Sequence, residues 1–302
     1  MIDLDEYFRT AARGGYLGQL TPEFQQALRQ HHSGLTPADC NFYHAMELPG
    51  GVLVQGEWDL RGHEALYLGG FDFNNKRVLE FGPASGHLTF TMEKSGATVV
   101  SFDLLFDAAP AIVPTPGVDP VKAAEAGREH MRRMRNSWWY SRFRYDSAAQ
   151  AVYGDIHNIP SDLGRFDVAV FAAILLHLPD PFRALQQAAA LVDDAMIVVE
   201  PMPVVSQPDL PALYFNPPAP MPVRVVFWWS ISPAAVTRML TTLGFPDVTI
   251  TTHRPSRRSP SSNSLEGAEW FTIVGRRSAK RATRSNGNAG DMPESGLHSQ
   301  ST

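Results

Sequence analysis

Residues 77–103, with the sequence RVLEFGPASGHLTFTMEKSGATVVSFD, decide the fold. An apolar run ends at Glu80 and is followed by two glycines, Gly82 and Gly86. A helical stretch then leads to a second apolar run, which ends at Asp103. A strand, a glycine turn, a helix and a second strand in this order are typical of a parallel sheet that binds a nucleoside-bearing cofactor at the carboxyl ends of its strands.

The alternation of strand and helix continues on the C-terminal side of this stretch. Apolar runs near 151–153, 166–171 and 195–199 are predicted strands, and helices are predicted over 119–136 and 181–192. Such alternation favours βαβ units, in which helices cover both faces of a parallel sheet. The chain is therefore predicted to have an α/β, Rossmann-like fold. A further helix over 233–243 and strands at 248–252 and 270–274 complete the pattern.

Three segments lie outside this pattern. Residues 1–70 are predicted to form an N-terminal helical or cap segment, with Thr21-Pro22 and Thr36-Pro37 as helix starts. Within the main domain of 71–275, residues 201–229 are rich in proline and large apolar side chains, so that a lid-like insertion is expected. Residues 276–302 are rich in Ser, Arg, Gly and Asn and are predicted to be disordered.

Composition restricts the class of protein. The 302 residues carry a formal net charge of −5, which argues against the basic footprint of a nucleic-acid binder. The single cysteine, Cys40, cannot form an internal disulfide and, with no recognisable histidine cluster, leaves no expected metal site. No signal-peptide pattern and no apolar run of membrane-spanning length are recognisable, so a cytoplasmic protein without membrane contact is expected.

The glycine turn distinguishes between possible cofactors. A dinucleotide site requires G-x-G-x-x-G, because the pyrophosphate packs against open backbone. Here Pro83 stands between Gly82 and Ala84, which weighs against NAD. Amide groups at the start of the following helix suit a carboxylate or phosphate, and Asp103 lies where a carboxylate can accept both ribose hydroxyls.

These residues resemble motif I of class I S-adenosylmethionine-dependent methyltransferases, with the acid that follows it. The pair at 155–156, the strand at 166–171 and the LTTLGF run at 240–245 resemble later motifs of the same family. The resemblance implies a mostly parallel sheet whose last strand is antiparallel, and S-adenosylmethionine as cofactor. The cofactor contacts that it implies are Glu80, Gly82, Pro83, Ala84, Ser85, Gly86, Asp103, Leu104, Asp155, Ile156 and Ala172.

A closer resemblance is to the tRNA uridine-5-oxyacetic acid (carboxy)methyltransferase-like group. It is carried by the GEWD run at 56–59, LLH at 175–177, Glu200-Pro201 and the FWWSIS run at 227–232. Leu176 stands where that group has a tyrosine. The departure and the acidic charge together favour a small-molecule acceptor, with methyl transfer to O, N or C, over tRNA.

Candidate acceptor-side residues flank the expected cofactor. His177 follows the strand at 166–171 and could accept a proton from the acceptor, or could instead be a structural histidine that bonds to loop backbone. Arg224 could pair with a substrate carboxylate or reach solvent. Trp58, Tyr140 and Trp228 could stack on a flat acceptor or pack in the core.

Alternatives to small-molecule methyl transfer remain at this point. One is a tRNA-modifying methyl- or carboxymethyltransferase, and another is a protein that binds S-adenosylmethionine without catalysis. The acceptor and the oligomeric state are not predicted by the sequence.

Overall fold

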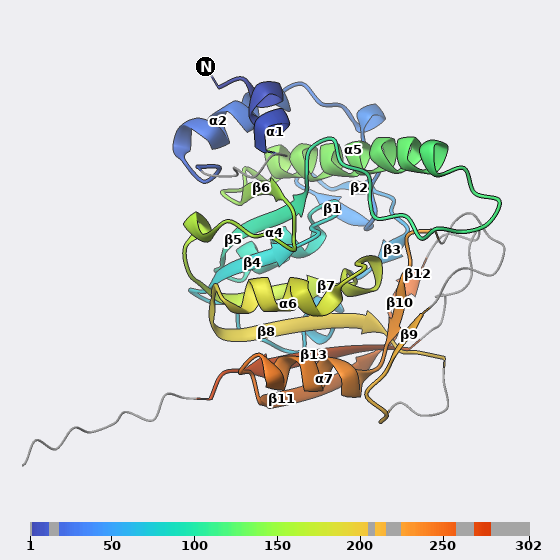
Figure 1. The fold of residues 1–302 in the computed structure, drawn as a ribbon. Helices are drawn as coiled ribbons and strands as arrows, with labels where there is room; N and C mark the ends of the chain where they lie inside the picture. Colours follow the sequence, from blue (N-terminus) through green and yellow to red (C-terminus); the bar gives the residue numbers. More distant parts are fainter. Residues whose placement is uncertain (1, 12–17, 205–208, 216–224, 258–268, 279–302) are drawn as a thin grey trace, which may run out of the picture.

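The computed structural model describes residues 2–11, 18–204, 209–215, 225–257 and 269–278. Its centre is a seven-stranded sheet in the order β11-β13-β8-β7-β4-β5-β6 (Figure 1). The strands are β4 (Arg77–Phe81), β5 (Thr98–Leu104), β6 (Gln150–Gly154), β7 (Phe166–Ala172), β8 (Val192–Pro201), β11 (Asp247–His253) and β13 (Trp270–Arg276). β4 to β8 pair in parallel, whereas β13 runs antiparallel to both of its neighbours. The predicted Rossmann-like sheet with an antiparallel last strand is confirmed.

Helices cover both faces of the sheet (Figure 1). One face packs against α4 (His87–Lys94) and α5 (Pro120–Tyr145), together with α1 (Leu4–Ala11), α2 (Pro22–His31) and α3 (Glu64–Tyr67). The other face packs against α6 (Pro181–Ala189) and α7 (Pro233–Thr242). Strand side chains alternate between the two cores, as Val78 and Leu79 do. The carboxyl ends of β4 to β8 therefore meet at one edge, where the predicted site residues lie.

Three predictions about helices are wrong in extent. The helix expected over 181–192 ends at Ala189, and β8 begins at Val192. The helix expected over 119–136 continues to Tyr145, because its second half buries Trp138 and Trp139 against the sheet. The helix start at Thr36-Pro37 gives only a single 3-10 turn, η1 (Pro37–Asp39). The Asp39 carboxylate closes that turn on Thr36, and the chain then crosses to α5, where the Asn41 N–H donates to the Arg133 carbonyl (3.1 Å).

The N-terminal segment forms small strand pairs as well as helices. β1 (Met46–Leu48) pairs with β2 (Val52–Val54) across the Pro49-Gly50-Gly51 turn, as the turn residues predict. β3 (Trp58–Asp59) pairs with β12 (Ser256–Arg257) near the other end of the chain. In the proline-rich segment, β9 (Leu213–Phe215) pairs with β10 (Trp229–Ile231). Within the described ranges, no helix combines the length and the apolar character needed to cross a bilayer.

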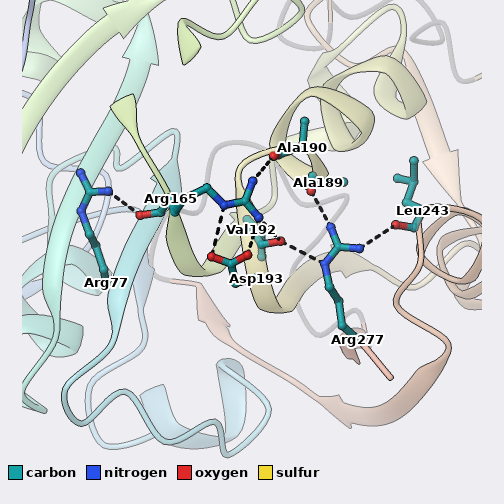
Figure 2. A network of polar contacts seen from close by, with 8 residues as sticks. All are labelled: Arg77, Arg165, Ala189, Ala190, Val192, Asp193, Leu243 and Arg277. Carbon is teal, nitrogen blue, oxygen red and sulfur yellow. Dashed lines mark hydrogen bonds and ion pairs between the residues drawn. The ribbon is translucent and has the colours of Figure 1, made fainter. Parts of the chain in front are cut away.

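Arginines secure the opposite, amino edge of the sheet (Figure 2). Arg277 donates to three carbonyls: those of Ala189 (2.6 Å) and Leu243 (3.5 Å) at the ends of α6 and α7, and that of Val192 (3.0 Å). Such carbonyls have no partner within their own helices, so a side-chain donor stabilises the helix end. Arg77 and Arg165 bond to further loop carbonyls beside it. Residues 276 and 277 thus belong to the folded part, and 279–302 lie outside the described residues.

Arg277→Ala is expected to lower the free energy of unfolding by about 1–3 kcal/mol, because a charged donor to three carbonyls is lost. The matched control is Arg276→Ala, which removes a half-exposed arginine that pairs with Asp194 (3.0 Å) and should cost less than about 1 kcal/mol. Urea unfolding followed by circular dichroism measures both. An equal loss of unfolding free energy in the two variants would show that the carbonyl contacts of Arg277 stabilise the protein no more than the ion pair of Arg276.

Candidate cofactor and acceptor site

The glycine turn between β4 and α4, residues 82–86, is called the cradle below. Gly82 (φ 64°), Ala84 (φ 50°) and Gly86 (φ 89°) adopt positive φ, which side chains disfavour. A Cβ on Gly82 would lie 2.1 Å from the Ile174 Cδ1 atom, and one on Gly86 would collide with the Phe90 ring. Both positions therefore require glycine. The Ser85 hydroxyl, fully buried within the turn, accepts the N–H of His44 (3.1 Å) and so ties the N-terminal segment to it.

Glu80, near the end of β4, anchors the elements on either side of this turn through hydrogen bonds. Its carboxylate accepts the hydroxyls of Thr89 on α4 and Ser101 on β5, and the Trp138 indole donates to Thr89 in turn (3.1 Å). Burial raises the pKa of Glu80 to about 7, although the two hydroxyls act in the opposite direction. The partners of the Glu80 carboxylate in this structure are therefore hydroxyl groups. Glu80 thus joins β4, β5 and α4 beneath the turn.

Asp103 lies at the tip of β5, next to the glycine turn. Among the residues that the structure describes, the one hydrogen bond to its carboxylate comes from the Leu104 N–H (2.8 Å). Burial raises the pKa of Asp103, while the charge of Arg135 acts against that shift. Arg135 reaches over from α5 and donates to the Phe106 carbonyl (2.6 Å). The carboxylate therefore keeps acceptor capacity for two hydroxyl groups.

The tip of β6 lies beside β5, because Leu104 is the strand partner of Gly154. Gly154 packs on the Phe102 ring, and a Cβ there would be 2.7 Å from it. Asp155 follows as an exposed residue whose carboxylate accepts the His157 N–H (2.9 Å), and Ile156 beside it is half-buried. Asp103 thus lies at the tip of β5, and the 155–156 pair directly follows the neighbouring strand β6.

On the side of β4 away from β5, the carboxyl edge of the sheet is formed by Ala172 and the turn after β7. His177 ends the 3-10 helix η3 (Leu175–His177), and its Nδ1 lies 2.9 Å from the Val226 carbonyl. That bond makes Nδ1 the donor, so that Nε2 of the neutral ring carries the lone pair. Burial lowers the pKa of His177, which keeps the ring neutral near pH 7.

A strap, defined as residues 225–229, crosses the edge above His177. The Val113 N–H donates to the Val225 carbonyl (2.6 Å), and the Trp228 indole donates to the Ala111 carbonyl (3.1 Å). On the other side, the Trp228 N–H donates to the Leu176 carbonyl (2.8 Å). The strap therefore joins the loop after β5 to the turn after β7. The lid expected over 201–229 stays a prediction, and its residues 205–208 and 216–224 lie outside the described residues.

The aromatic candidates occupy different places. Trp228 belongs to the strap, whereas Tyr140 lies half-buried on α5 with its ring 6.2 Å from that of Phe42. Trp58 is only 4% exposed and, with Tyr43, lines a small cavity of about 10 Å³. Arg224 lies outside the described residues. The described residues contain no group of three or more His, Cys, Asp or Glu side chains that could hold a metal ion.

Sequence reasoning missed the importance of Glu200, at the end of β8. Its carboxylate is 1% exposed and accepts the Leu175 N–H (2.8 Å) in the turn that carries His177. Burial raises the pKa of Glu200 to about 8, and the amides of the turn act in the opposite direction. A charged residue at the end of an apolar strand was the available signal, because such a side chain is buried only when it has partners.

The cradle at 82–86 and the acceptor capacity of Asp103 fit S-adenosylmethionine. The turn brings positive-φ backbone without side chains at Gly82 and Gly86 to the end of β4, and the Asp103 carboxylate suits two ribose hydroxyls. Asp155 is exposed and Ile156 half-buried directly after the neighbouring strand β6. When bound, S-adenosylmethionine supplies a sulfonium methyl group that a nucleophile can displace.

Comparison with known proteins agrees with this geometry. A family model described as a methyltransferase domain matches residues 55–248. The N-terminal domain of EvdMO1, solved in the presence of S-adenosylhomocysteine and D-fucose, has 16% identity and a TM-score of 0.53, over 84% of this chain and 97% of that one. The same domain with S-adenosylhomocysteine bound gives 15% and 0.52, over 92% and 98%. A search of curated proteins found no match.

A third structure is more distant. The 1,6-didemethyltoxoflavin-N1-methyltransferase of Burkholderia thailandensis, solved with its substrate and S-adenosylhomocysteine, has 16% identity and a TM-score of 0.45, over 73% of this chain and 78% of that one. The family match spans well over half of the 302 residues and includes the glycine turn, Asp103 and the 155–156 pair. The chain therefore belongs to the methyltransferase-domain family and is an S-adenosylmethionine-dependent methyltransferase.

Proposed function

We propose that this methyltransferase transfers its methyl group to O, N or C of a small molecule that reaches the edge between the glycine turn and the strap. The observation that carries the proposal is the strap itself. It is hydrogen-bonded to Ala111 on one side and Leu176 on the other, and so joins the loop after β5 to the turn after β7. An edge crossed by such a strap suits a small acceptor better than a folded RNA. The net charge of −5 supports the same choice, because phosphate contacts need a basic surface.

Roles for individual residues are part of the proposal. The turn at 82–86 and Glu80 would hold the methionine end of the cofactor, Asp103 and Leu104 the ribose, and Asp155 and Ile156 the adenine. Ala172 would lie beside the cofactor at the end of β7. The EvdMO1 domain, studied with a sugar and S-adenosylhomocysteine together, supports a small acceptor beside the donor.

His177 would act on the acceptor. Its Nδ1 is occupied by the Val226 carbonyl, so Nε2 would accept the proton that an O–H or N–H acceptor loses. Holding donor and acceptor in line supplies much of the rate in such a displacement. His177→Gln is therefore expected to slow transfer by about 10²-fold for an O–H or N–H acceptor that still carries its proton at the assay pH, while the affinity for S-adenosylhomocysteine changes less than about threefold.

The acceptor class is tested with tritiated S-adenosylmethionine. The protein is incubated separately with a low-molecular-weight cell extract, with total tRNA, and with buffer. We expect label to enter the small-molecule fraction and not the tRNA, and His177→Gln to reduce it. Label in tRNA would overturn the proposal in favour of an RNA-modifying enzyme. S-Adenosylhomocysteine binding without transfer to either fraction would overturn it in favour of a non-catalytic protein.

A further inference from the structure

Glu200 holds the turn after β7 from inside the protein. Its carboxylate is buried at the end of β8, and Oε1 accepts the Leu175 N–H at 2.8 Å. The neighbouring amides of Ile174 and Leu176 also favour its ionised form, so three successive amides face one carboxyl group. A carboxyl group offers two oxygens and several lone pairs, which no other side chain of this length provides.

The turn needs such support because its backbone is strained. Ala173, which precedes the three amides, has φ 56°, in the left-handed region that residues other than glycine disfavour. Its N–H donates to the Val199 carbonyl (2.8 Å), so β8 holds both sides of Ala173 through Val199 and Glu200. A strained conformation persists only where its surroundings determine it, and it is concentrated at functional sites.

One end of this turn contacts the donor cradle, and the other end contacts the strap. At one end, the Ile174 side chain packs so closely on Gly82 that a Cβ there would be 2.1 Å from Cδ1. At the other end, His177 bonds to the strap through the Val226 carbonyl, and its ring lies 5.0 Å from that of Phe227. A shift of the turn would therefore move a wall of the donor cradle and the imidazole together.

We propose that Glu200 is a positioning residue, which sets the 173–177 turn so that Ile174 closes on the donor cradle and His177 presents Nε2 at the acceptor edge. Glu200 touches neither donor nor acceptor and acts through the amides of the turn. The part that concerns His177 rests on the proposed function, whereas the part that concerns Ile174 rests only on the donor cradle.

Three variants separate positioning from simple stability. Glu200→Ala removes every acceptor from the turn. Glu200→Gln keeps one oxygen for the Leu175 N–H. The matched control, Val198→Ala, removes buried volume two residues earlier on the same side of β8 and leaves the Glu200 carboxylate in place. It should lower the melting temperature by about 5 °C, as other core truncations do.

The readouts are the affinity for S-adenosylhomocysteine by isothermal titration and the ¹⁵N resonances of the His177 ring. We expect Glu200→Ala to weaken binding about tenfold, the effect of one lost hydrogen bond, and to replace the single Nδ1–H tautomer by a mixture. Glu200→Gln should restore most of both signals, and Val198→Ala should change neither. If Glu200→Ala does not fold, the comparison of Glu200→Gln with wild type decides, through the Leu175 amide resonance, which should move.

Unchanged binding and an unchanged His177 tautomer in Glu200→Ala would overturn the proposal, as would equal losses in Val198→Ala. An unmoved Leu175 amide in Glu200→Gln would also count against it. None of these measurements uses an acceptor. They can therefore succeed even if the small-molecule acceptor of the proposed function is wrong, and can fail even if it is right.

Discussion

Asp103→Ala is expected to weaken the binding of S-adenosylhomocysteine by about 100-fold while leaving the protein folded. The carboxylate stands at the tip of β5 with one hydrogen bond from the described residues, that of the Leu104 N–H. Two ribose hydroxyls would complete its coordination with charge-assisted hydrogen bonds. Losing both contacts costs about 3 kcal/mol, which corresponds to about 100-fold in affinity.

The stability of this variant should not fall, because a buried carboxylate with few partners is costly to the folded protein. Burial raises the pKa of Asp103, which means that its charged form is disfavoured there. The matched control is Asp107→Ala, which removes an exposed carboxylate four residues later, in the loop after β5. Isothermal titration should find that control within about twofold of wild type. An Asp103→Ala protein that binds nearly as tightly would refute the ribose contact.

The sequence predicted the sheet well because its signal is local. Strand, glycine turn, helix and strand follow one another within 77–103, and each boundary is marked by a glycine or a carboxylate. The parallel register then follows, since successive βαβ units bring the strand ends to one edge. Asp103 and the 155–156 pair therefore lie at the tips of neighbouring strands, while their contacts with the cofactor stay a prediction.

Partners of these side chains were less predictable, because they depend on contacts between distant segments. Glu80 bonds to Thr89 and Ser101 only because α4 folds back over β5. The contact between His44 and Ser85 joins residues 41 positions apart. Periodicity within a segment carries no information about such pairs. The contacts that the N-terminal segment and the strap make around the site could therefore not be derived from sequence.

The two buried carboxyl groups imply an unusual dependence of stability on pH. The folded protein holds the pKa of Glu80 at about 7, and of Glu200 at about 8, above the ordinary value of 4.5. Between pH 4.5 and these values the folded state binds more protons than the unfolded state. The stability that each group contributes is therefore present at low pH and is lost as pH rises through the folded pKa.

Glu80→Gln isolates this effect, because glutamine resembles the protonated carboxyl group at every pH. Buried histidines such as His32, whose pKa burial lowers to about 3, act in the opposite direction, so only the difference between variant and wild type is informative. From pH 5 to pH 8 that difference should shift in favour of the variant by about 2–3 kcal/mol, since 1 pKa unit is about 1.4 kcal/mol. Urea unfolding at four pH values within this range measures it.

Glu129→Gln is the control for this prediction. Glu129 is exposed, and its hydrogen bond with Arg132 lowers the pKa of Glu129, so its titration falls below the range measured. The difference between this variant and wild type should therefore stay flat from pH 5 to pH 8. A flat difference for Glu80→Gln as well would mean that Glu80 is already ionised at pH 5. In that case the hydroxyls of Thr89 and Ser101 would outweigh burial, and the carboxylate beneath the donor turn would be a fixed charge.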